Sequence, residues 1–367
     1  MKILHVLYSG LGGHGNVFFS MVKADVDKEM EYEALFYGIE HVREEYIDQC
    51  KKNRIKFFVA KKTKGIDICY YVRILNSIKI SNPDIVFLHG SAYIFPAKIA
   101  GYLSKKKCRI IVRETQANHL KTNLQWITLS ISMQLANKIV CLSPNFKEQI
   151  KEKIKWLYRR KKVVVIPNGI DLSVYKPGEK KPDDSIIIIG MQSRIIQIKD
   201  HATLLEAFAI VKNFSKNTGK KVVLKIAGDG ELKSDLIILS KQLNIEKDVI
   251  FTGMLNEPEL TIFLNSLDIY IHASFGETMS TAIMQAMACG LPVIASDVEG
   301  INNMVANLLN GILVPVQNEL LMARAIDRLI NDPILKKSLG QNARIYAIDN
   351  FSNQTMFYNY KTQIFAR

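Results

Sequence analysis

Cysteine is scarce and scattered in this chain of 367 residues. There are five cysteines, and no two of them have the C-x-x-C spacing. An odd number of widely separated thiols argues against a disulfide framework and against a zinc site. We therefore expect reduced cysteines and a cytoplasmic location.

Long apolar runs are also missing. No run approaches the ~20 residues that a membrane-spanning helix needs. The N-terminal stretch ILHVLYSG lacks the longer apolar run and small-residue cleavage site of a secretion signal, and it is typical of a buried strand. We expect no spanning helix, and at most peripheral association with the inner face of the plasma membrane.

Several catalytic motifs are absent from the sequence. It contains no H-E-x-x-H, G-x-x-x-x-G-K-[ST] or G-x-S-x-G, which argues against zincin, P-loop and α/β-hydrolase chemistry. Asp25 and Asp27 have D-x-D spacing, but they lie in an acidic helical stretch that favours a solvated surface. We expect neither a metal nor a cofactor.

Acidic residues are underrepresented in one half of the chain. Residues 1–170 hold 29 Lys+Arg and 14 Asp+Glu, a net +15, whereas residues 171–367 hold 20 and 21, a net −1. A basic half favours an anionic partner, such as nucleic acid, a membrane or a phosphorylated substrate. Aromatic residues are not interleaved with these cations beyond Trp156 and Tyr158, so we expect no nucleic acid.

The segment Lys151–Lys162 concentrates this charge, with seven cations and one acid. If it is helical, Ile150, Ile154 and Leu157 share one face. That pattern predicts a segment lying on an anionic membrane surface. The alternative is that the apolar face packs against the core of the domain.

Thirteen short apolar runs alternate with longer amphipathic stretches, which indicates parallel α/β architecture. Seven predicted strands precede a Pro-Asn-Gly turn at residues 167–169, and six follow it: 3–8, 34–37, 55–59, 85–89, 109–113, 139–142 and 163–166, then 186–190, 222–227, 249–251, 269–272, 292–295 and 312–314. We expect one domain over residues 1–168, a second over 169–349, and a helix of about residues 350–367 packing back on the first.

Ligands of open α/β sheets bind beyond the carboxyl ends of the strands, so the functional side chains are expected in the loops after the strands. A glycine-rich loop, residues 9–15, follows the first strand and is suited either to a phosphate or simply to a tight turn. Arg194 and Lys199 follow the strand 186–190, where two cations can clamp a diphosphate or merely be solvated.

A third loop carries a single carboxylate, Glu277, after the strand 269–272. Thr278, Ser280 and Thr281 are predicted in the first turn of the next helix. A carboxylate accepts two hydroxyl groups at once, which suits a sugar or a ribose. The alternative is a surface carboxylate stabilised by the helix N-terminus.

Together these stretches resemble the family-four-type retaining glycosyltransferases of the GT-B fold (glycosyl transferases group 1). The matching motifs are IPNGID (166–171), SRIIQIKD (193–200), IAGDGEL (226–232), FTGML (251–255) and the run from E-T-M-S to V-I-A-S-D (277–297). The resemblance implies an α/β, GT-B architecture. In it, an N-terminal acceptor-binding and a C-terminal donor-binding Rossmann-like domain face each other across a central cleft.

The resemblance also implies roles for particular residues. Arg194 and Lys199 match the pair that binds the donor diphosphate, and Glu277 matches the acid that contacts the transferred sugar. Gln285 stands where the family has the second acid of E-x7-E, which holds the ribose, so donor affinity and nucleotide identity are open. The remaining residues expected at the donor are Gly12, Gly13, Gly253, Met254, Leu255, Thr278, Met279, Ser280 and Thr281.

Three residues at strand ends are candidates to meet the acceptor or the sugar: His89, Glu114 and His119. A histidine at the end of a strand is more often structural than catalytic, so a structural role is the alternative interpretation.

The function that the resemblance implies is a metal-independent, retaining hexosyltransferase. Its donor would be a nucleotide-diphosphate sugar, with UDP- expected before GDP-, and its acceptor a lipid-linked glycan in bacterial lipopolysaccharide or capsule assembly. One alternative is a nucleotide-sugar epimerase of the same fold, which needs acid and base carboxylates. The other is a non-catalytic nucleotide-sugar-binding protein, which Gln285 makes conceivable.

Overall fold

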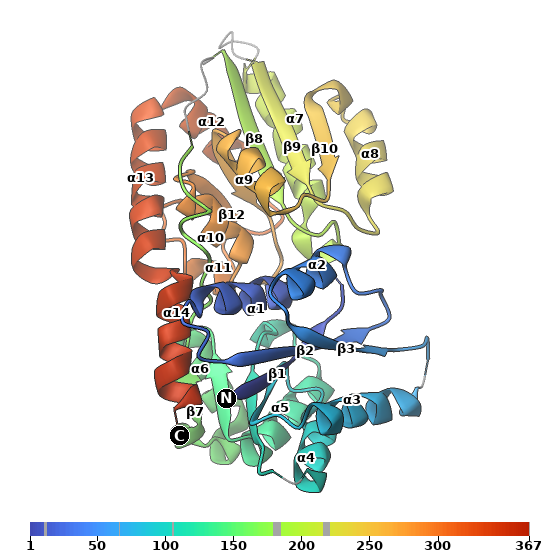
Figure 1. The fold of residues 1–367 in the computed structure, drawn as a ribbon. Helices are drawn as coiled ribbons and strands as arrows, with labels where there is room; N and C mark the ends of the chain where they lie inside the picture. Colours follow the sequence, from blue (N-terminus) through green and yellow to red (C-terminus); the bar gives the residue numbers. More distant parts are fainter. Residues whose placement is uncertain (11–12, 66, 105, 179–184, 216–220, 367) are drawn as a thin grey trace. The chain divides into compact units, whose positions relative to one another are not determined.

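The computed structural model describes residues 1–367 except 11–12, 66, 105, 179–184, 216–220 and 367 (Figure 1). Its contacts divide the chain into two compact units. Unit 1 comprises Met1–Asp171 and Asn353–Arg367, and unit 2 comprises Leu172–Ser352. The sequence predicts these boundaries at residues 168 and 349. Each unit is a parallel-sheet α/β domain, so the predicted fold class is confirmed.

Unit 1 has a seven-stranded sheet in the order β3-β2-β1-β4-β5-β6-β7. Because the chain moves outward from β1 in both directions, the point where the order reverses lies between β1 and β4. The strands are β1 (Lys2–Tyr8), β2 (Glu31–Gly38), β3 (Lys56–Lys61), β4 (Ile85–His89), β5 (Arg109–Arg113), β6 (Lys138–Cys141) and β7 (Val163–Val165).

Two layers of helices cover this sheet. Successive strand residues point to opposite faces, so Ile3 packs with one layer and Leu4 with the other. The first layer holds α1 (Gly13–Ala24), α2 (Glu44–Lys52), α14 (Asn353–Tyr360) and the π-helical turn η6 (Lys361–Phe365). The second holds α3 (Ile68–Ser81), α4 (Ile94–Leu103), α5 (Asn123–Leu135) and α6 (Pro144–Ile154).

The C-terminal segment completes the core of unit 1. Phe357 and Tyr360 of α14 share a buried cluster with Phe18 of α1. The Arg109 guanidinium donates hydrogen bonds to the carbonyl oxygens of residues 364, 365 and 366 at 3.1, 3.0 and 2.9 Å. The end of the chain therefore packs on unit 1 after the chain has passed through unit 2.

Unit 2 has a six-stranded sheet in the order β10-β9-β8-β11-β12-β13. The strands are β8 (Ile186–Gln192), β9 (Lys221–Ala227), β10 (Val249–Gly253), β11 (Ile269–His272), β12 (Val293–Ser296) and β13 (Ile312–Val314). The helices are α7 (His201–Ser215), α8 (Lys233–Gln242), α9 (Glu257–Asn265), α10 (Thr281–Ala288), α11 (Glu299–Asn302), α12 (Glu319–Asn331) and α13 (Pro333–Asn350). All thirteen predicted strands are found.

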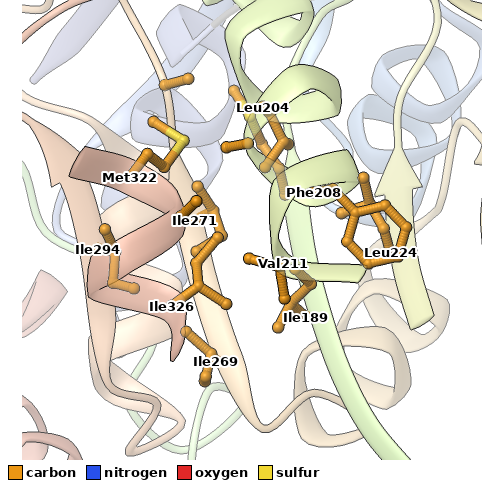
Figure 2. Close-up of a cluster of buried hydrophobic side chains, with 14 of the residues drawn as sticks. Ile189, Leu204, Phe208, Val211, Leu224, Ile269, Ile271, Ile294, Met322 and Ile326 are labelled. Carbon is orange, nitrogen blue, oxygen red and sulfur yellow. The ribbon is translucent and has the colours of Figure 1, made fainter. Parts of the chain in front are cut away.

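Buried aliphatic side chains hold α7 and α12 on the sheet of unit 2. Figure 2 shows Phe208 of α7 and Ile326 of α12 beside the strand residues Ile189, Ile271 and Ile294. All five side chains are completely buried. Burial of one such side chain stabilises a fold by about 1.5–3 kcal/mol, so this cluster fixes the strand ends that carry the site.

The predicted helical face of Ile150, Ile154 and Leu157, turned outward to a membrane, is wrong. Helix α6 ends at Ile154, and Lys155 has a left-handed φ of 43° that turns the chain into the short η2 (Lys155–Leu157). Ile150 and Ile154 are buried in the core, and Leu157 packs against it. The apolar face therefore packs inward, as in the alternative interpretation, and Trp156 alone of the apolar residues in this segment is strongly exposed, at 80%.

None of the helices in the described part of the chain combines the length and the apolar character that crossing a membrane requires.

Candidate active site in unit 2

Two of the predicted motifs meet where the strand order of unit 2 reverses. This point lies between β8 and β11, and the loops after both strands leave the sheet at the same edge. The loops are tied together because the carbonyl oxygen of Ile198 accepts hydrogen bonds from the Phe275 amide at 2.9 Å and the Ser274 hydroxyl at 3.0 Å. Residues 193–200 and 273–280 therefore form one site.

Lys199 and Glu277 form an ion pair at the centre of this site. Lys199 ends the short η4 (Gln197–Lys199), and Glu277 lies in the loop before α10. The Lys199 Nζ contacts Glu277 Oε1, and each side chain is 13% exposed. Two residues that the sequence separates by 78 positions are thus partners.

His272 is a second partner of Glu277 that the sequence analysis missed. It is the last residue of β11 and is fully buried, with its Nε2 2.8 Å from Glu277 Oε1. Burial lowers the pKa of His272 and outweighs the opposing effect of Glu277, so the ring is neutral. A neutral ring that carries its proton on Nε2 can donate to Glu277, while the Tyr270 hydroxyl, 3.3 Å from Nδ1, donates to the Gln192 carbonyl at 3.2 Å. The sequence signal for this residue was a histidine at the end of a buried strand, five residues before an acid.

Glu277 is ionised at neutral pH. Burial alone would raise the pKa of its carboxyl, but the Lys199 charge and the His272 hydrogen bond bring the pKa down to about 2. The site therefore presents a fixed carboxylate, which accepts hydroxyl groups and cannot act as a proton donor near neutrality.

Arg194 supplies the second cation of the predicted pair. It lies in the loop between β8 and η4 and is partly buried. Within the described residues, its guanidinium has neither a hydrogen bond nor an ion-pair partner. Five N–H donors in a planar fork are thus available in the loop that leads to Lys199, and such a fork can bind a phosphate group bidentately.

The loop after β9 holds the Arg194 loop in place. The Ser193 amide donates to the Ala227 carbonyl at 3.0 Å, and the Ile195 amide to the Asp229 carbonyl at 2.9 Å. The backbones approach so closely that a Cβ on Gly228 would overlap the Ser193 carbonyl oxygen, and Gly228 also has a φ of +140°. The IAGDGEL motif is therefore structural support for the loop that carries Arg194.

Replacing Gly228 with alanine is expected to destabilise unit 2 by about 2 kcal/mol or more, because a steric overlap is added to an unfavourable φ. Gly253→Ala is the matched control, since Gly253 has a φ of +76° but no atom within 4 Å of an added Cβ. Denaturant unfolding of both variants measures the difference. Equal losses in the two would show that the close approach to Ser193 is unimportant.

Gln285 lies on α10, and Ser280 lies at the N-terminal end of this helix. Gln285 is 5% exposed, and its Oε1 accepts a hydrogen bond from Gln192 Nε2 at 2.6 Å. Ser280 is the N-cap of α10, with its Oγ accepting from the Ile283 amide, and the helix begins at Thr281. Because Ser280 caps the helix, Thr278 and Met279 precede it. The sequence prediction that placed Thr278 in the first turn is therefore wrong.

The remaining predicted donor residues are spread over both units. Gly253 ends β10, and its carbonyl accepts from the Gly228 amide at 2.8 Å, which brings the loop with Met254 and Leu255 next to the IAGDGEL loop. Gly13 begins α1 in unit 1. Gly12 lies outside the described residues.

His89 of unit 1 belongs to a buried polar chain. It ends β4, is 3% exposed, and its Nδ1 accepts from Arg113 Nη1 at 3.2 Å. Its Nε2 then donates to His5 Nδ1, 3.1 Å away. Burial, with the Arg113 charge, holds the pKa of His89 well below its usual value. His89 is thus a neutral, buried residue with structural partners.

Glu114 and His119 have different surroundings. Glu114 is 2% exposed and pairs with Lys121 at 3.6 Å, while His119 is exposed in η1 (Asn118–Leu120).

The sequence analysis did not single out His14 and Thr115, which are both partly buried beyond the ends of β1 and β5 and lie 3.1 Å apart. His14 stands inside the glycine-rich loop, which was the signal available for it.

Comparisons with known proteins agree with this architecture. The family description "Glycosyltransferase Family 4" matches residues 11–174, and "Glycosyl transferases group 1" matches residues 175–346. Among solved structures, Anabaena HepE in complex with UDP and glucose superposes with a TM-score of 0.81 over 100% of both chains at 18% identity. The galactosyltransferase WaaB of the lipopolysaccharide outer core gives a TM-score of 0.71 at 19% identity, over 100% of this chain and 99% of WaaB.

Curated relatives include two bacterial transferases. The UDP-Gal:alpha-D-GlcNAc-diphosphoundecaprenol alpha-1,3-galactosyltransferase of Escherichia coli is 26% identical over 81% of this chain and 80% of its own length. A diphospho-undecaprenol-linked 4-alpha-N-acetylgalactosaminyltransferase of Campylobacter jejuni is 27% identical over 72% of this chain and 71% of its own length. The two family matches together cover both domains, so this chain belongs to the glycosyltransferases of the GT-B fold, with a Glycosyltransferase Family 4 half followed by a glycosyl transferases group 1 half.

Proposed function

We propose that this glycosyltransferase moves a hexose from a UDP-sugar to a lipid-linked glycan acceptor, with retention of anomeric configuration and without a metal ion. The observation that carries the proposal is the grouping of Arg194, Lys199 and the ionised Glu277 at the strand-order reversal of unit 2. In this proposal, the sugar transfer takes place at the inner face of the plasma membrane and contributes to the assembly of surface polysaccharide.

The charges suit the two parts of such a donor. Arg194 and Lys199 would bind the diphosphate, and Glu277 would accept hydroxyl groups of the transferred sugar. As negative charge develops on the departing diphosphate, two fixed cations stabilise it more than they stabilise the ground state. This is the role that a divalent metal has in other transferases, and here two side chains would supply it.

Retention follows if the acceptor attacks from the face that the diphosphate leaves. The bond from C1 to the diphosphate oxygen breaks, and a bond from C1 to the acceptor oxygen forms on the same side. The acceptor proton passes to the departing diphosphate oxygen. Glu277 has a pKa of about 2 and two partners of its own, so its role is to orient the sugar.

The similar proteins support the choice of donor and acceptor. HepE is a GT-B structure in complex with UDP and glucose, and the Escherichia coli relative is named for a UDP-galactose donor. Both relatives described above are named for acceptors linked to a diphosphoundecaprenol lipid. Gln285 is compatible with a ribose, since its amide can accept one hydroxyl, although it brings no charge.

The transfer assay that tests the proposal combines the protein, one UDP-sugar at a time and a polyprenyl-diphosphate sugar, with and without EDTA. The expected product carries one more hexose, forms equally well with EDTA, and shows the anomeric configuration of the donor by NMR. An inverted product, a product that requires a metal, or a donor sugar that is only epimerised would contradict the proposal.

Arg194→Lys keeps the charge but loses the planar fork. We expect kcat/KM to fall roughly tenfold, because hydrogen bonds to a charged group contribute about 1.5–3 kcal/mol each. The control is Arg324→Lys on α12, outside the site loops of the same unit. A loss no larger than that of the control would remove Arg194 from the donor site.

A further inference from the structure

The second helix layer of unit 1 exposes apolar side chains on its outer surface. Helix α4 contacts both α3 and α5, and α5 contacts η2, so the layer is continuous (Figure 1). We call its outer surface the α3–α4–α5 face. Its exposed large apolar residues are Ile68, Tyr71, Val72 and Ile80 of α3, Phe95, Ile99, Tyr102 and Leu103 of α4, Leu124 and Ile127 of α5, and Trp156 of η2.

Helix α4 shows the pattern most clearly. Its sequence, IFPAKIAGYL, has one charged residue, Lys98. Phe95, Ile99 and Tyr102 follow at helical spacing on the outer side and are 49%, 49% and 89% exposed, whereas Ile94, Ala97 and Ala100 are buried against the sheet. A surface helix normally has a polar outer face, and a helix that is apolar all round indicates a second apolar surface on its outer side.

Negative charge is sparse on helices α3, α4 and α5. Between residues 68 and 147 the acidic residues are Asp84 and Glu114, while Asp67 caps α3 and α6 carries Glu148 and Glu152. Asp84 contacts Lys106 and accepts from the Lys2 amide at 2.8 Å. Glu114 is buried with Lys121. Helices α3, α4 and α5 themselves contain no Asp or Glu at all.

Exposed cations lie on the same helices and in the segments after them. They are Lys79 of α3, Lys98 of α4, Lys106 and Lys107 after α4, and Lys155, Arg159 and Arg160 after α6. Burial lowers the pKa of Lys162, and the nearby charges of Lys98 and Arg159 lower it further. Helix α4 and the chain after α6 therefore carry positive charge close to one another.

We propose that the α3–α4–α5 face docks on a bilayer that contains anionic phospholipids. Exposed apolar and aromatic side chains would enter the interface between headgroups and acyl chains, and the cations would contact headgroup phosphates. The absence of acids from these three helices favours this occupant over a protein partner of mixed charge. The inference deepens the proposed function, because docking brings the enzyme to a lipid-linked acceptor. Its test, however, needs neither donor nor transfer.

Co-sedimentation with vesicles tests the face directly. The full chain is expected to sediment with vesicles of phosphatidylcholine and phosphatidylglycerol, and much less with phosphatidylcholine alone. The double variant Phe95→Ser, Tyr102→Ser should weaken binding at least about tenfold, since each buried aromatic contributes about 1.5–3 kcal/mol. The matched control is Ile262→Ser, Ile334→Ser in unit 2, where the two side chains are 72% and 82% exposed.

Lys98→Gln and Lys107→Gln test the charge. Each is expected to weaken binding to the anionic vesicles about fivefold, because a basic residue near such a surface contributes about 1 kcal/mol. Lys247→Gln, an exposed lysine of unit 2, is the control and should have no effect. An unchanged melting temperature would show that the variants remain folded.

Three results would overturn the inference: no preference for anionic vesicles, equal losses in the control variants, or a dimer in solution that the Phe95→Ser, Tyr102→Ser variant converts to monomer. The last would assign the face to a second copy of the chain. Vesicle binding without any transfer activity would contradict the proposed function and leave the docking surface standing.

Discussion

Replacing Lys199 with methionine is expected to lower turnover by about 10²–10³-fold, the usual loss when one group that stabilises transition-state charge is removed. The same change leaves Glu277 as a buried carboxylate without its cation, and the pKa of Glu277 should rise from about 2. Breaking a buried pair in this way costs about 3–5 kcal/mol of stability. Steady-state kinetics and urea unfolding measure the two effects.

A double variant separates the two roles of the pair. Lys199→Met, Glu277→Gln removes both charges, so it should be more stable than Lys199→Met alone and equally inactive. Lys233→Met is the control, since Lys233 pairs with Asp229 at 3.3 Å in an exposed position, and such pairs contribute about 0–1 kcal/mol. Turnover of Lys199→Met within a few-fold of the wild type would exclude Lys199 from the donor site.

Unit 1 is expected to lose stability steeply as the pH falls below about 6.5. Burial and the Arg113 charge lower the pKa of His5 to about 3, and they hold the pKa of His89 well below its usual value. Both rings are neutral in the folded state, whereas both bind a proton in the unfolded chain. The unfolded state thus binds two more protons, and the free energy of unfolding falls by about 2.7 kcal/mol per pH unit.

Tryptophan fluorescence reports this unfolding, because the two tryptophans, Trp126 and Trp156, both lie in unit 1. His5→Phe should reduce the slope to about 1.4 kcal/mol per pH unit. Its ring would lie between Phe18 and Phe87, whose centroids are each 4.7 Å from that of His5. His41→Asn, at an exposed histidine, is the control. An unchanged slope in His5→Phe would contradict the assignment of a buried neutral ring.

The strands were predictable because they are local patterns. Continuous apolar runs such as IIIIG mark buried parallel strands, and their order along the chain with glycine-rich turns between them identifies two α/β domains. The cations Arg194 and Lys199 were predictable in the same way, since both follow a strand end. The sequence could not show that Lys199 pairs with Glu277, because that contact depends on β8 and β11 being neighbours in the sheet.

Other features needed the packed structure. The spacing of Ile150, Ile154 and Leu157 indicates one helical face, but not whether that face meets the core or a membrane. In the sequence, His272 is only one residue of a predicted buried strand, and its contact with Glu277 is visible only in the structure. Gly228 is predicted as a turn glycine. Only the position of the Ser193 carbonyl shows why a larger residue does not fit there.

Calorimetric titration with UDP and with UMP tests whether Arg194 and Lys199 hold the diphosphate of the donor. The wild type is expected to bind UDP more tightly than UMP, because the second phosphate gains contacts with both cations. Arg194→Ala should lose most of that difference while UMP affinity changes little. Equal affinities of the wild type for UDP and UMP, or a preference for UDP that survives in Arg194→Ala, would contradict the account.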